Sequence, residues 1–307
     1  PILKNVVIFG GTGFIGKQLV NRLKSDYKVI VFSRHKRSTS ELFDSSVSIA
    51  RLKRTDISKI VEHIDGAKAI INLAGENVGK RWTKVRKQKI TNSRLDINSM
   101  IVRAVRSCNT KPEVLIQGSA IGFYGFSRIN FDIDESNSKG KRGFLTKLSI
   151  SHEESVEQLE SIIRVVYLRT GLVLGSDGGA LPKMLKQYNL YVGGRYGNGK
   201  QWNSWIHIED EVRAIIYLLE NENCQGPYNL TAPNPVINKV FSSTLAKVLG
   251  KPNIFPAPAF ALRLILGSMA NELLLSGVKV IPKRLLEDGF NFKFSNLTDA
   301  LRDITKN

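Results

Sequence analysis

The chain has 307 residues, of which 42% are hydrophobic and 23% charged. This is the balance of an ordinary globular protein. The sequence has no internal repeats and no low-complexity tracts, so repeat proteins and low-complexity proteins are excluded. The formal net charge of +18 is unusual for a metabolic enzyme. A charge of this size suits nucleic acid, an anionic membrane face, or a basic compartment such as the mitochondrial matrix.

The densest group of positive charges lies between Lys80 and Lys89. On a helix these charges spread around most of the circumference, which is typical of a solvated face. No RNA- or DNA-binding motif surrounds them, so nucleic acid is not predicted as a partner. Docking of the basic surface on a larger protein assembly stays open. The expected compartment is the mitochondrial matrix or the cytoplasm.

The apolar and cysteine content bears on membranes and metals. The longest apolar stretch, residues 259–277, is interrupted by residues such as Arg263 and Glu272, so a buried helix is predicted rather than a membrane span. The two cysteines, Cys108 and Cys224, match no metal or redox spacing. Reduced thiols in an intracellular compartment are therefore expected, and no metal site is predicted.

Strand and helix patterns alternate from the start of the chain. Short apolar runs predict strands at residues 5–9, 27–32, 47–52, 69–73, 113–118, 164–168 and 226–230. Helical patterns are found at residues 15–24, 80–89, 96–108, 145–159, 209–221 and 239–249. Helices of this length between strands imply parallel crossovers, hence a parallel sheet that is covered on both faces.

The predicted fold class is α/β, a Rossmann doubly wound parallel sheet with a small C-terminal substrate lobe. From about Gly171 the regular alternation loosens, and glycine-rich and proline-rich loops appear at residues 178–179, 193–199 and 252–258. Residues 1–170 are therefore expected to form the nucleotide-binding core. Residues 171–307 are expected to form a lobe that interleaves with the end of the sheet and covers the site.

A glycine-rich turn separates the first predicted strand from the first predicted helix. Its seven residues are Gly10, Gly11, Thr12, Gly13, Phe14, Ile15 and Gly16. Glycines in this context let backbone N–H groups approach a pyrophosphate, while the helix that starts near Phe14 points its partial positive end at the same group. The turn therefore predicts a dinucleotide site, and a purely structural turn is the alternative.

The end of the second strand indicates which dinucleotide binds. An acidic residue at this point would bind the ribose 2′-hydroxyl and mark NAD. The chain has Ser33 and Arg34 instead, a hydroxyl and a guanidinium, which are the partners that a 2′-phosphate needs. NADP(H) is therefore the predicted cofactor, although Arg34 is also one of 45 basic residues.

Motifs along nearly the whole chain resemble those of one protein family. The glycine turn, followed by Asp56-Ile57 and by NLAGEN at residues 72–77, resembles the extended short-chain dehydrogenase/reductases. Later segments are similar to one atypical subgroup, the epimerase family proteins. They are RWT at 81–83, NSR at 92–94, GSAIGFYG at 118–125, LRTGLVL at 168–174, WIHIED at 205–210 and KVIPKR at 279–284.

The resemblance implies roles for matching positions. Asp56 and Ile57 would lie by the adenine, and Ser119 would stand at the nicotinamide as the catalytic serine. The cofactor would be lined after the fourth strand by Leu73, Ala74, Gly75 and Glu76, and flanked at the nicotinamide by Arg169 and Gly171. His207 and Asp210 would shape the lobe over the substrate.

Several of these positions have structural alternatives. Asp56 and Asn72 are also typical strand-end turn residues. Trp205 and His207 are also interpreted as core residues, and Arg94 as a cap or an ion-pair partner within the fold.

The usual acid–base pair of the superfamily is missing. That chemistry needs a tyrosine and a lysine four residues apart on one helix face, because the lysine lowers the pKa of the phenol. The expected helix has no tyrosine, and the pair Tyr196 and Lys200 falls in a glycine-rich loop. The candidates for the general acid are Ser119, Tyr124, Lys147 and His152, of which Ser119 and Tyr124 are the predicted catalytic residues.

Two functions are compatible with this pattern. The first is an NADP(H)-dependent oxidoreductase or epimerase that acts on a small, unidentified carbonyl or hydroxyl substrate. The second is a non-catalytic subunit that holds NADPH within a larger assembly, for which the mitochondrion is one expected location. The missing tyrosine and the high positive charge support the second, and bound nucleotide could stabilise such a subunit without any chemistry. The first is the predicted function, and the second is kept as the alternative.

Overall fold

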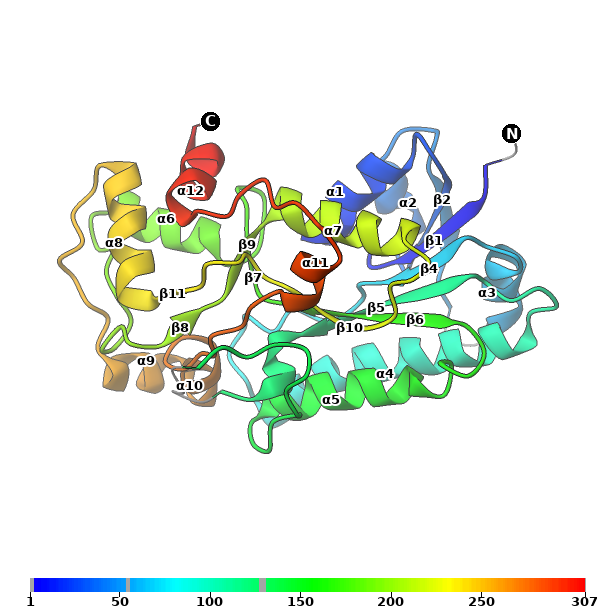
Figure 1. Ribbon diagram of the computed structural model, residues 1–307. Coiled ribbons are helices and arrows are strands. Elements are labelled where there is room, and N and C mark those ends of the chain that lie inside the picture. The colour runs from blue at the N-terminus through cyan, green and yellow to red at the C-terminus, as the bar shows by residue number, and fades with distance from the viewer. Residues whose placement is uncertain (1–2, 54–55, 127–130, 307) are drawn as a thin grey trace.

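The computed structural model describes residues 3–53, 56–126 and 131–306 and is built around one parallel sheet (Figure 1). The seven strands lie in the order β10-β6-β5-β4-β1-β2-β3, and every neighbouring pair is parallel. In chain order they are β1 Asn5–Phe9, β2 Lys28–Ser33, β3 Ser48–Arg51, β4 Ala69–Asn72, β5 Val114–Ala120, β6 Arg164–Thr170 and β10 Gly226–Leu230. The predicted Rossmann fold is thereby confirmed.

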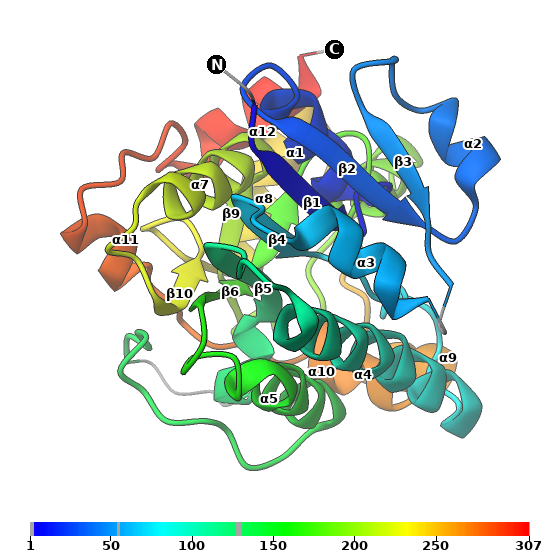
Figure 2. The ribbon, with the colours of Figure 1, turned by 90° about the vertical axis from the view of Figure 1, so that its right-hand side faces the viewer.

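The central residues of β1, β2, β4 and β6 are apolar and buried because helices cover both faces of the sheet. On one face Val6 and Ile8 pack with α1 (Phe14–Leu23) and α7 (Ile208–Glu220). On the other face Val7 and Phe9 pack with α3 (Ile57–Ile64), α4 (Lys84–Ser107) and α5 (Phe144–Glu157). Figure 2 shows these two helix layers on opposite sides of the strands.

The remaining elements form mainly a lobe at one end of the sheet (Figure 1). Its core contains Trp205, Phe241 and Leu301. The elements are β7 Leu172–Leu174, α6 Leu181–Asn189, β8 Trp202–Asn203, β9 Trp205–His207, β11 Val236–Ile237, α8 Asn238–Leu249, α9 Ala259–Leu266, α10 Ser268–Leu273 and α12 Leu297–Thr305. Helix α11 (Lys283–Glu287) packs instead against β10 and the main core. The division at residue 170 stays a prediction, and α7 and β10, which follow it in the chain, belong to the layers of the central sheet.

The basic segment after β4 differs from the prediction of two separate helices. Helix α4 runs without a break and begins at Lys84 rather than at residue 80, because the Thr83 side chain accepts a hydrogen bond from the backbone N–H of Arg86. Its inward face includes Arg94 and Asn98 among apolar residues. These polar residues interrupt the apolar period, so the sequence pattern suggested two helices where one exists.

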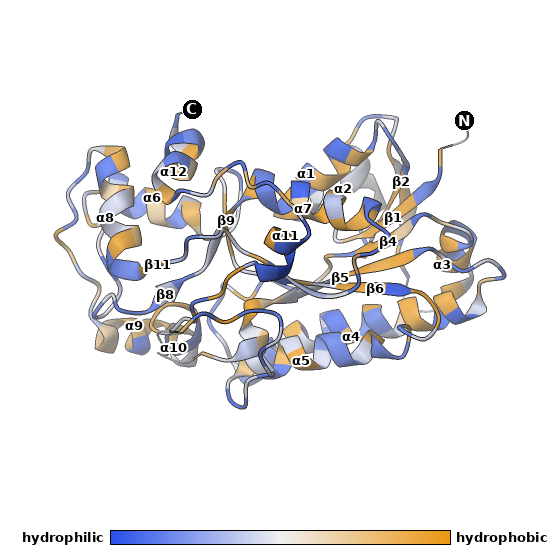
Figure 3. Cartoon of the chain, in the orientation of Figure 1, coloured by the Kyte–Doolittle hydropathy of each residue, from blue (hydrophilic) through white to orange (hydrophobic). Residues whose placement is uncertain are grey.

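The apolar stretch at residues 259–277 is not the single buried helix that was predicted. Gly267, at φ +62°, separates α9 from α10, and no residue of α9 is buried. Figure 3 shows α9 at the outer end of the lobe, where no further layer covers it. Within the described residues, no helix has both the length and the apolar character needed to cross a bilayer.

Candidate functional site

The glycine turn lies at the carboxyl end of β1, where the strand order reverses between β1 and β4. In open α/β sheets this crevice is where ligands bind. Gly10 has φ +82°, and a Cβ there would lie 2.6 Å from the Leu73 carbonyl carbon in the loop after β4. A Cβ on Gly16 would overlap the Gly10 carbonyl oxygen. Both glycines are therefore required by the packing of the chain on itself.

Gly13 is different, because little in the chain requires a glycine there. Its φ of −77° is open to any residue, and a Cβ would meet only the Gly10 carbonyl oxygen, at 3.3 Å. Gly13 is exposed, and it precedes a helix whose first turn has no side-chain cap and no acidic residue. Free backbone N–H groups, an uncapped positive helix end and unfilled space above Gly13 fit a diphosphate.

Phe14, predicted to line the cofactor, also contacts the lobe. Its ring lies against the loop after β7, where a Cβ on Gly175 or Gly178 would come within 2.7 Å of ring atoms. Ile15, the next residue, is half-buried and packs against the main core. The first turn of α1 is therefore held by the C-terminal lobe as well as by the sheet.

Ser33 and Arg34 close the second strand beside the glycine turn. The Ser33 hydroxyl oxygen accepts hydrogen bonds from the Thr39 hydroxyl at 2.7 Å and from the His35 N–H at 3.2 Å, in and before the short helix α2 (Lys36–Ser40). The Arg34 side chain is 70% exposed and reaches across to the loop after β4, where its Nη2 lies 3.8 Å from the Glu76 Oε1.

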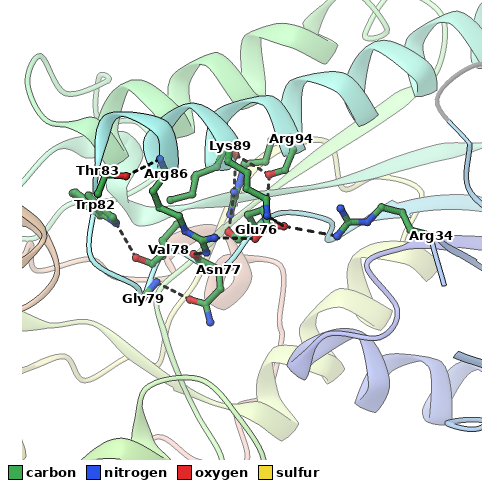
Figure 4. A network of polar contacts seen from close by, with 12 residues as sticks. Arg34, Glu76, Asn77, Val78, Gly79, Trp82, Thr83, Arg86, Lys89 and Arg94 are labelled. Carbon is green, nitrogen blue, oxygen red and sulfur yellow. Dashed lines mark hydrogen bonds and ion pairs between the residues drawn. The ribbon is translucent and has the colours of Figure 1, made fainter. Parts of the chain in front are cut away.

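Glu76 is the centre of a group of positive charges (Figure 4). Besides Arg34, its carboxylate lies 3.3 Å from the Arg86 Nη1 and 3.7 Å from the Lys89 Nζ. The basic segment was predicted to be a solvated face, which is wrong for Arg86, since its side chain is only 18% exposed. One carboxylate cannot neutralise three cations, so the opening between β2 and β4 carries excess positive charge.

Arg94 adds a fourth cation behind this group. Its Nη1 donates to the carbonyl oxygens of Glu76 and Ile90 at 3.2 and 3.1 Å, and burial lowers its pKa to about 10 although Glu76 opposes the shift. A Cβ on Gly75 would lie 2.5 Å from the Arg94 guanidinium carbon. The capping alternative for Arg94 therefore has direct geometric support.

Asn72 and Asp56 both make structural hydrogen bonds. Asn72 is fully buried at the end of β4 and donates to the Asn98 Oδ1 and the Gln117 Oε1, while its own Oδ1 accepts from the Ala74 N–H. Asp56 caps α3 by accepting from the Lys59 N–H. Ile57 packs on the core beneath. The adenine role of Asp56 and Ile57 stays a prediction.

Ser119 and Arg169 end the neighbouring strands β5 and β6 and are joined by a carboxylate that the sequence did not reveal. The Ser119 hydroxyl donates to the Glu153 Oε1 at 2.6 Å. Arg169 donates to both Glu153 oxygens, at 2.9 and 2.8 Å, in a bidentate pair that is almost fully buried. Burial opposes the charge of Arg169, but Glu153 outweighs it and the pKa of Arg169 is raised.

Tyr124, on the short 3-10 helix Ile121–Tyr124 after β5, extends this group. Its hydroxyl accepts from the Arg169 Nη1 at 3.0 Å and donates to the Asn229 Oδ1 at 2.7 Å. Burial raises the pKa of Tyr124 to about 12, with Arg169 acting in the opposite direction. The phenol is thus protonated at neutral pH and lies beside a permanent cation, but unlike the tyrosine of a Tyr–Lys pair its pKa is raised above the usual value.

The other candidates for the general acid are placed less favourably. His152 is buried under the sheet, where its Nε2 lies 2.8 Å from the Gln117 Nε2, and burial lowers its pKa to about 3. It is therefore neutral at physiological pH. Lys147 points to the exposed side of α5. Neither side chain is joined to Ser119 by a hydrogen bond within the described part of the chain.

The residues expected to shape the lobe are mostly structural. His207 caps α7 by accepting from the Glu209 N–H and stacks on Phe294, and Trp205 is fully buried. Asp210 is buried and accepts from the backbone N–H groups of Lys293 and Phe294. Gly171 is required by packing, because a Cβ there would overlap the Ser204 carbonyl oxygen.

Comparison with known proteins identifies the family. The family model described as "NAD dependent epimerase/dehydratase family" matches residues 6–231, and a domain of unknown function, DUF1731, matches residues 257–304. The chain belongs to the epimerase family. An epimerase family protein of Staphylococcus aureus strain MW2 is 39% identical over 99% of this chain and 100% of its own length. The resemblance inferred from the motifs is confirmed.

Other epimerase family proteins extend the comparison to plants and humans. The SDR39U1 homolog of Arabidopsis thaliana, named as chloroplastic, is 36% identical over 97% of this chain and 86% of its own length. The crystal structure of human epimerase family protein SDR39U1 with NADPH is 28% identical, covers 99% of both chains and superposes with a TM-score of 0.87. UDP-glucose 4-epimerase of Thermus thermophilus, 17% identical with a TM-score of 0.76 over 98% of both chains, shares the fold.

Glu153 and Arg86 are the site residues that sequence reasoning missed. In α5 the residues Ser149, His152 and Glu153 lie on the face that is buried with Leu148 and Val156. Polar residues on the apolar face of an amphipathic helix mark a buried polar cluster. That pattern was available in the sequence. The resemblance had already placed Arg169 at the nicotinamide, but its pairing with Glu153 depends on how α5 lies against β6, which the sequence alone does not show.

Proposed function

We propose that the chain binds NADPH across the carboxyl end of β1, β4 and β2, with the diphosphate on the turn 10–16. The observation that carries the proposal is Gly13, because the packing of the chain leaves open the space that its missing side chain would fill. The human epimerase family protein crystallised with NADPH, which this chain matches along its whole length, supports the same cofactor.

The cations around Glu76 support the phosphorylated form of the cofactor. Arg34 is the residue that follows Ser33 at the end of β2, where a 2′-phosphate lies in NADP-binding Rossmann folds. Its only carboxylate partner in the described residues is the Glu76 Oε1 at 3.8 Å, which is a weak contact shared with Lys89. A dianionic phosphate would therefore gain Arg34 without breaking a strong ion pair.

We further infer that Tyr124 serves as the proton donor of a carbonyl reduction, or as the acceptor in the reverse reaction. The bound cofactor would supply or accept the hydride. The Tyr124 phenol would give its proton to the carbonyl oxygen as that oxygen becomes a hydroxyl, and the resulting phenolate would lie 3.0 Å from Arg169. Glu153 holds the guanidinium in place from the other side. The substrate class is a small carbonyl or hydroxyl compound.

A second candidate is a cofactor-holding role without chemistry. The Ser119 hydroxyl proton is engaged by Glu153 and that of Tyr124 by Asn229, so both predicted catalytic groups already have acceptors within the chain. A role in an assembly through the basic surface, and a mitochondrial location, stay predictions.

Cofactor choice is tested by calorimetric titration of the purified chain with NADPH and NADH. We expect NADPH to bind more tightly, and Arg34→Ala to weaken NADPH by about tenfold, since an exposed charged hydrogen bond contributes on the order of 1–2 kcal/mol. NADH binding should be unchanged by Arg34→Ala. The control is Arg103→Ala, an exposed arginine on α4 away from the turn. Equal binding of both cofactors would refute the role of Arg34.

Catalysis is tested by NADPH consumption with a panel of small aldehydes and ketones. We expect Tyr124→Phe to retain NADPH binding and to lower turnover by about a hundredfold or more, as general-acid contributions are of this size. If the wild-type chain binds NADPH but turns over nothing in the panel, the cofactor-holding role is favoured. If Tyr124→Phe leaves turnover intact, another group is the acid.

A further inference from the structure

Helix α9 presents its apolar side chains outward. Phe260, Leu264 and Ile265 are 74%, 78% and 65% exposed, and their spacing places them on one side of the helix. The loop that leads into α9 adds Ile254 and Phe255, both more than half exposed. Single exposed apolar residues are normal on proteins, but a contiguous group of this size marks an interaction surface.

A second exposed apolar segment lies beside this helix. Leu190, Tyr191 and Val192 follow α6, and all three are more than half exposed. The segment runs alongside the loop before α9, since the Ala257 N–H donates to the Arg195 carbonyl oxygen and the Lys251 Nζ donates to the Tyr191 hydroxyl. We call these residues together the α9 surface: 190–192, 254–255, 260, 264 and 265.

The two sequence segments that supply the α9 surface are free of acidic residues. Residues 178–208 and 223–271 contain no aspartate or glutamate. The same two segments contain the cations Lys183, Lys186, Arg195, Lys200, Lys239, Lys247, Lys251 and Arg263. None of these cations forms an ion pair within the described ranges of the chain. The next acid, Glu272, accepts from the first N–H groups of α5 and is not available to them.

We propose that the α9 surface docks on the face of an anionic phospholipid bilayer. Aromatic and aliphatic side chains would enter the boundary between headgroups and acyl chains, while the surrounding lysines and arginines would contact lipid phosphates. Long basic side chains suit this position, because their stems lie along apolar surface and their charged ends reach the headgroups. The molecule would lie on the membrane through one end of its lobe.

Charge argues against a second copy of the chain as the occupant. Two α9 surfaces that face each other would bring together Lys251 and Arg263 of both copies, and neither segment that supplies the surface holds an acid to compensate them. The apolar residues also come from three separate segments, without a single long helix or strand edge for a peptide partner to extend. A lipid surface adapts to such a shape and offers the complementary charge.

Vesicle sedimentation tests the proposal with the full chain. We expect binding to vesicles of phosphatidylglycerol and phosphatidylcholine, little binding to phosphatidylcholine alone, and loss of binding when salt rises from about 0.1 M to about 1 M and shortens the screening length from ~10 Å to ~3 Å. The double variant Phe260→Asp with Leu264→Asp should bind on the order of a hundredfold more weakly, because two apolar side chains no longer leave water. The matched control is Leu42→Asp, an exposed leucine between α2 and β3, outside the α9 surface.

Several outcomes would overturn the proposal. They are failure of the wild-type chain to bind anionic vesicles at low salt, equal binding to neutral vesicles, and wild-type binding by the double variant. A dimer in light scattering that the double variant dissociates, with no vesicle binding, would assign the surface to a second copy. Circular dichroism and NADPH titration of the double variant show whether it is folded, so a loss of binding is interpreted only for a folded chain.

Discussion

Replacing Gly13 by alanine should separate cofactor binding from folding. The backbone of Gly13, at φ −77° and ψ 176°, is accessible to alanine, and the new Cβ meets one atom at 3.3 Å. The slight crowding is offset by the smaller entropy of the unfolded alanine chain, so we expect the free energy of unfolding to change by less than about 1 kcal/mol. The same Cβ would stand in the space assigned to the diphosphate.

The expected loss of affinity follows from the hydrogen bonds involved. A charged hydrogen bond contributes about 1.5–3 kcal/mol, and displacing the diphosphate from one or two N–H groups would weaken NADPH on the order of a hundredfold or more. In thermal unfolding at a hundred times the wild-type Kd, NADPH should stabilise the wild type by about 2.7 kcal/mol and the variant by well under 1 kcal/mol.

The matched comparison is Gly16→Ala in the same turn. Its Cβ would overlap the Gly10 carbonyl oxygen, so this variant should lose about 1–3 kcal/mol of stability even without cofactor. If Gly13→Ala binds NADPH as tightly as the wild type, the diphosphate does not lie over the turn. If Gly13→Ala is as unstable as Gly16→Ala, the argument from open space is wrong.

Two further predictions concern buried carboxylates. Glu153→Gln should lower the free energy of unfolding, measured in urea titrations, by about 3–5 kcal/mol because it leaves Arg169 buried and unpaired. The control Glu154→Gln removes only an exposed pair with Lys139 and should cost less than about 1 kcal/mol. Similar losses for the two variants would refute the buried pair. Burial raises the pKa of Glu211 from 4.5 to about 8, so between these values the folded chain holds a proton that the unfolded chain has released. Stability should therefore fall as pH rises through this window, by up to about 1.4 kcal/mol per unit. The fall should be smaller in Glu211→Gln, and a pH profile that the substitution leaves unchanged would contradict the assignment.

Much of the nucleotide-binding half follows from local sequence. The apolar runs at β1 and β4 and the glycine turn are short-range signals, because a strand buried on both faces and a tight turn leave few residue types to choose from. The strand ends moved by one or two residues, as at β2 and β6, where the last residues face the site rather than the core. The family resemblance then extended this prediction to the cofactor.

The acid–base cluster and the lobe could not be obtained in this way. The pairing of Glu153 with Arg169 depends on how α5 lies against β6, a contact between segments that local periodicity does not encode. The error at residues 259–277 has another cause. An apolar segment is buried only where another part of the fold covers it, and the fold leaves Phe260, Leu264 and Ile265 of α9 exposed.

The ring of Phe14 lies between the turn that would hold the diphosphate and the loop at residues 175–179 of the lobe. Because both segments contact the same ring, the ordering of the glycine turn and the ordering of the loop are thermodynamically coupled. When one segment becomes ordered, less conformational entropy is lost in ordering the other. Cofactor binding in the nucleotide crevice should therefore slow amide hydrogen exchange in the loop that leads into α6. The dynamics of the lobe would then depend on whether the cofactor is bound at the sheet, without any rigid-body movement of the lobe relative to the sheet.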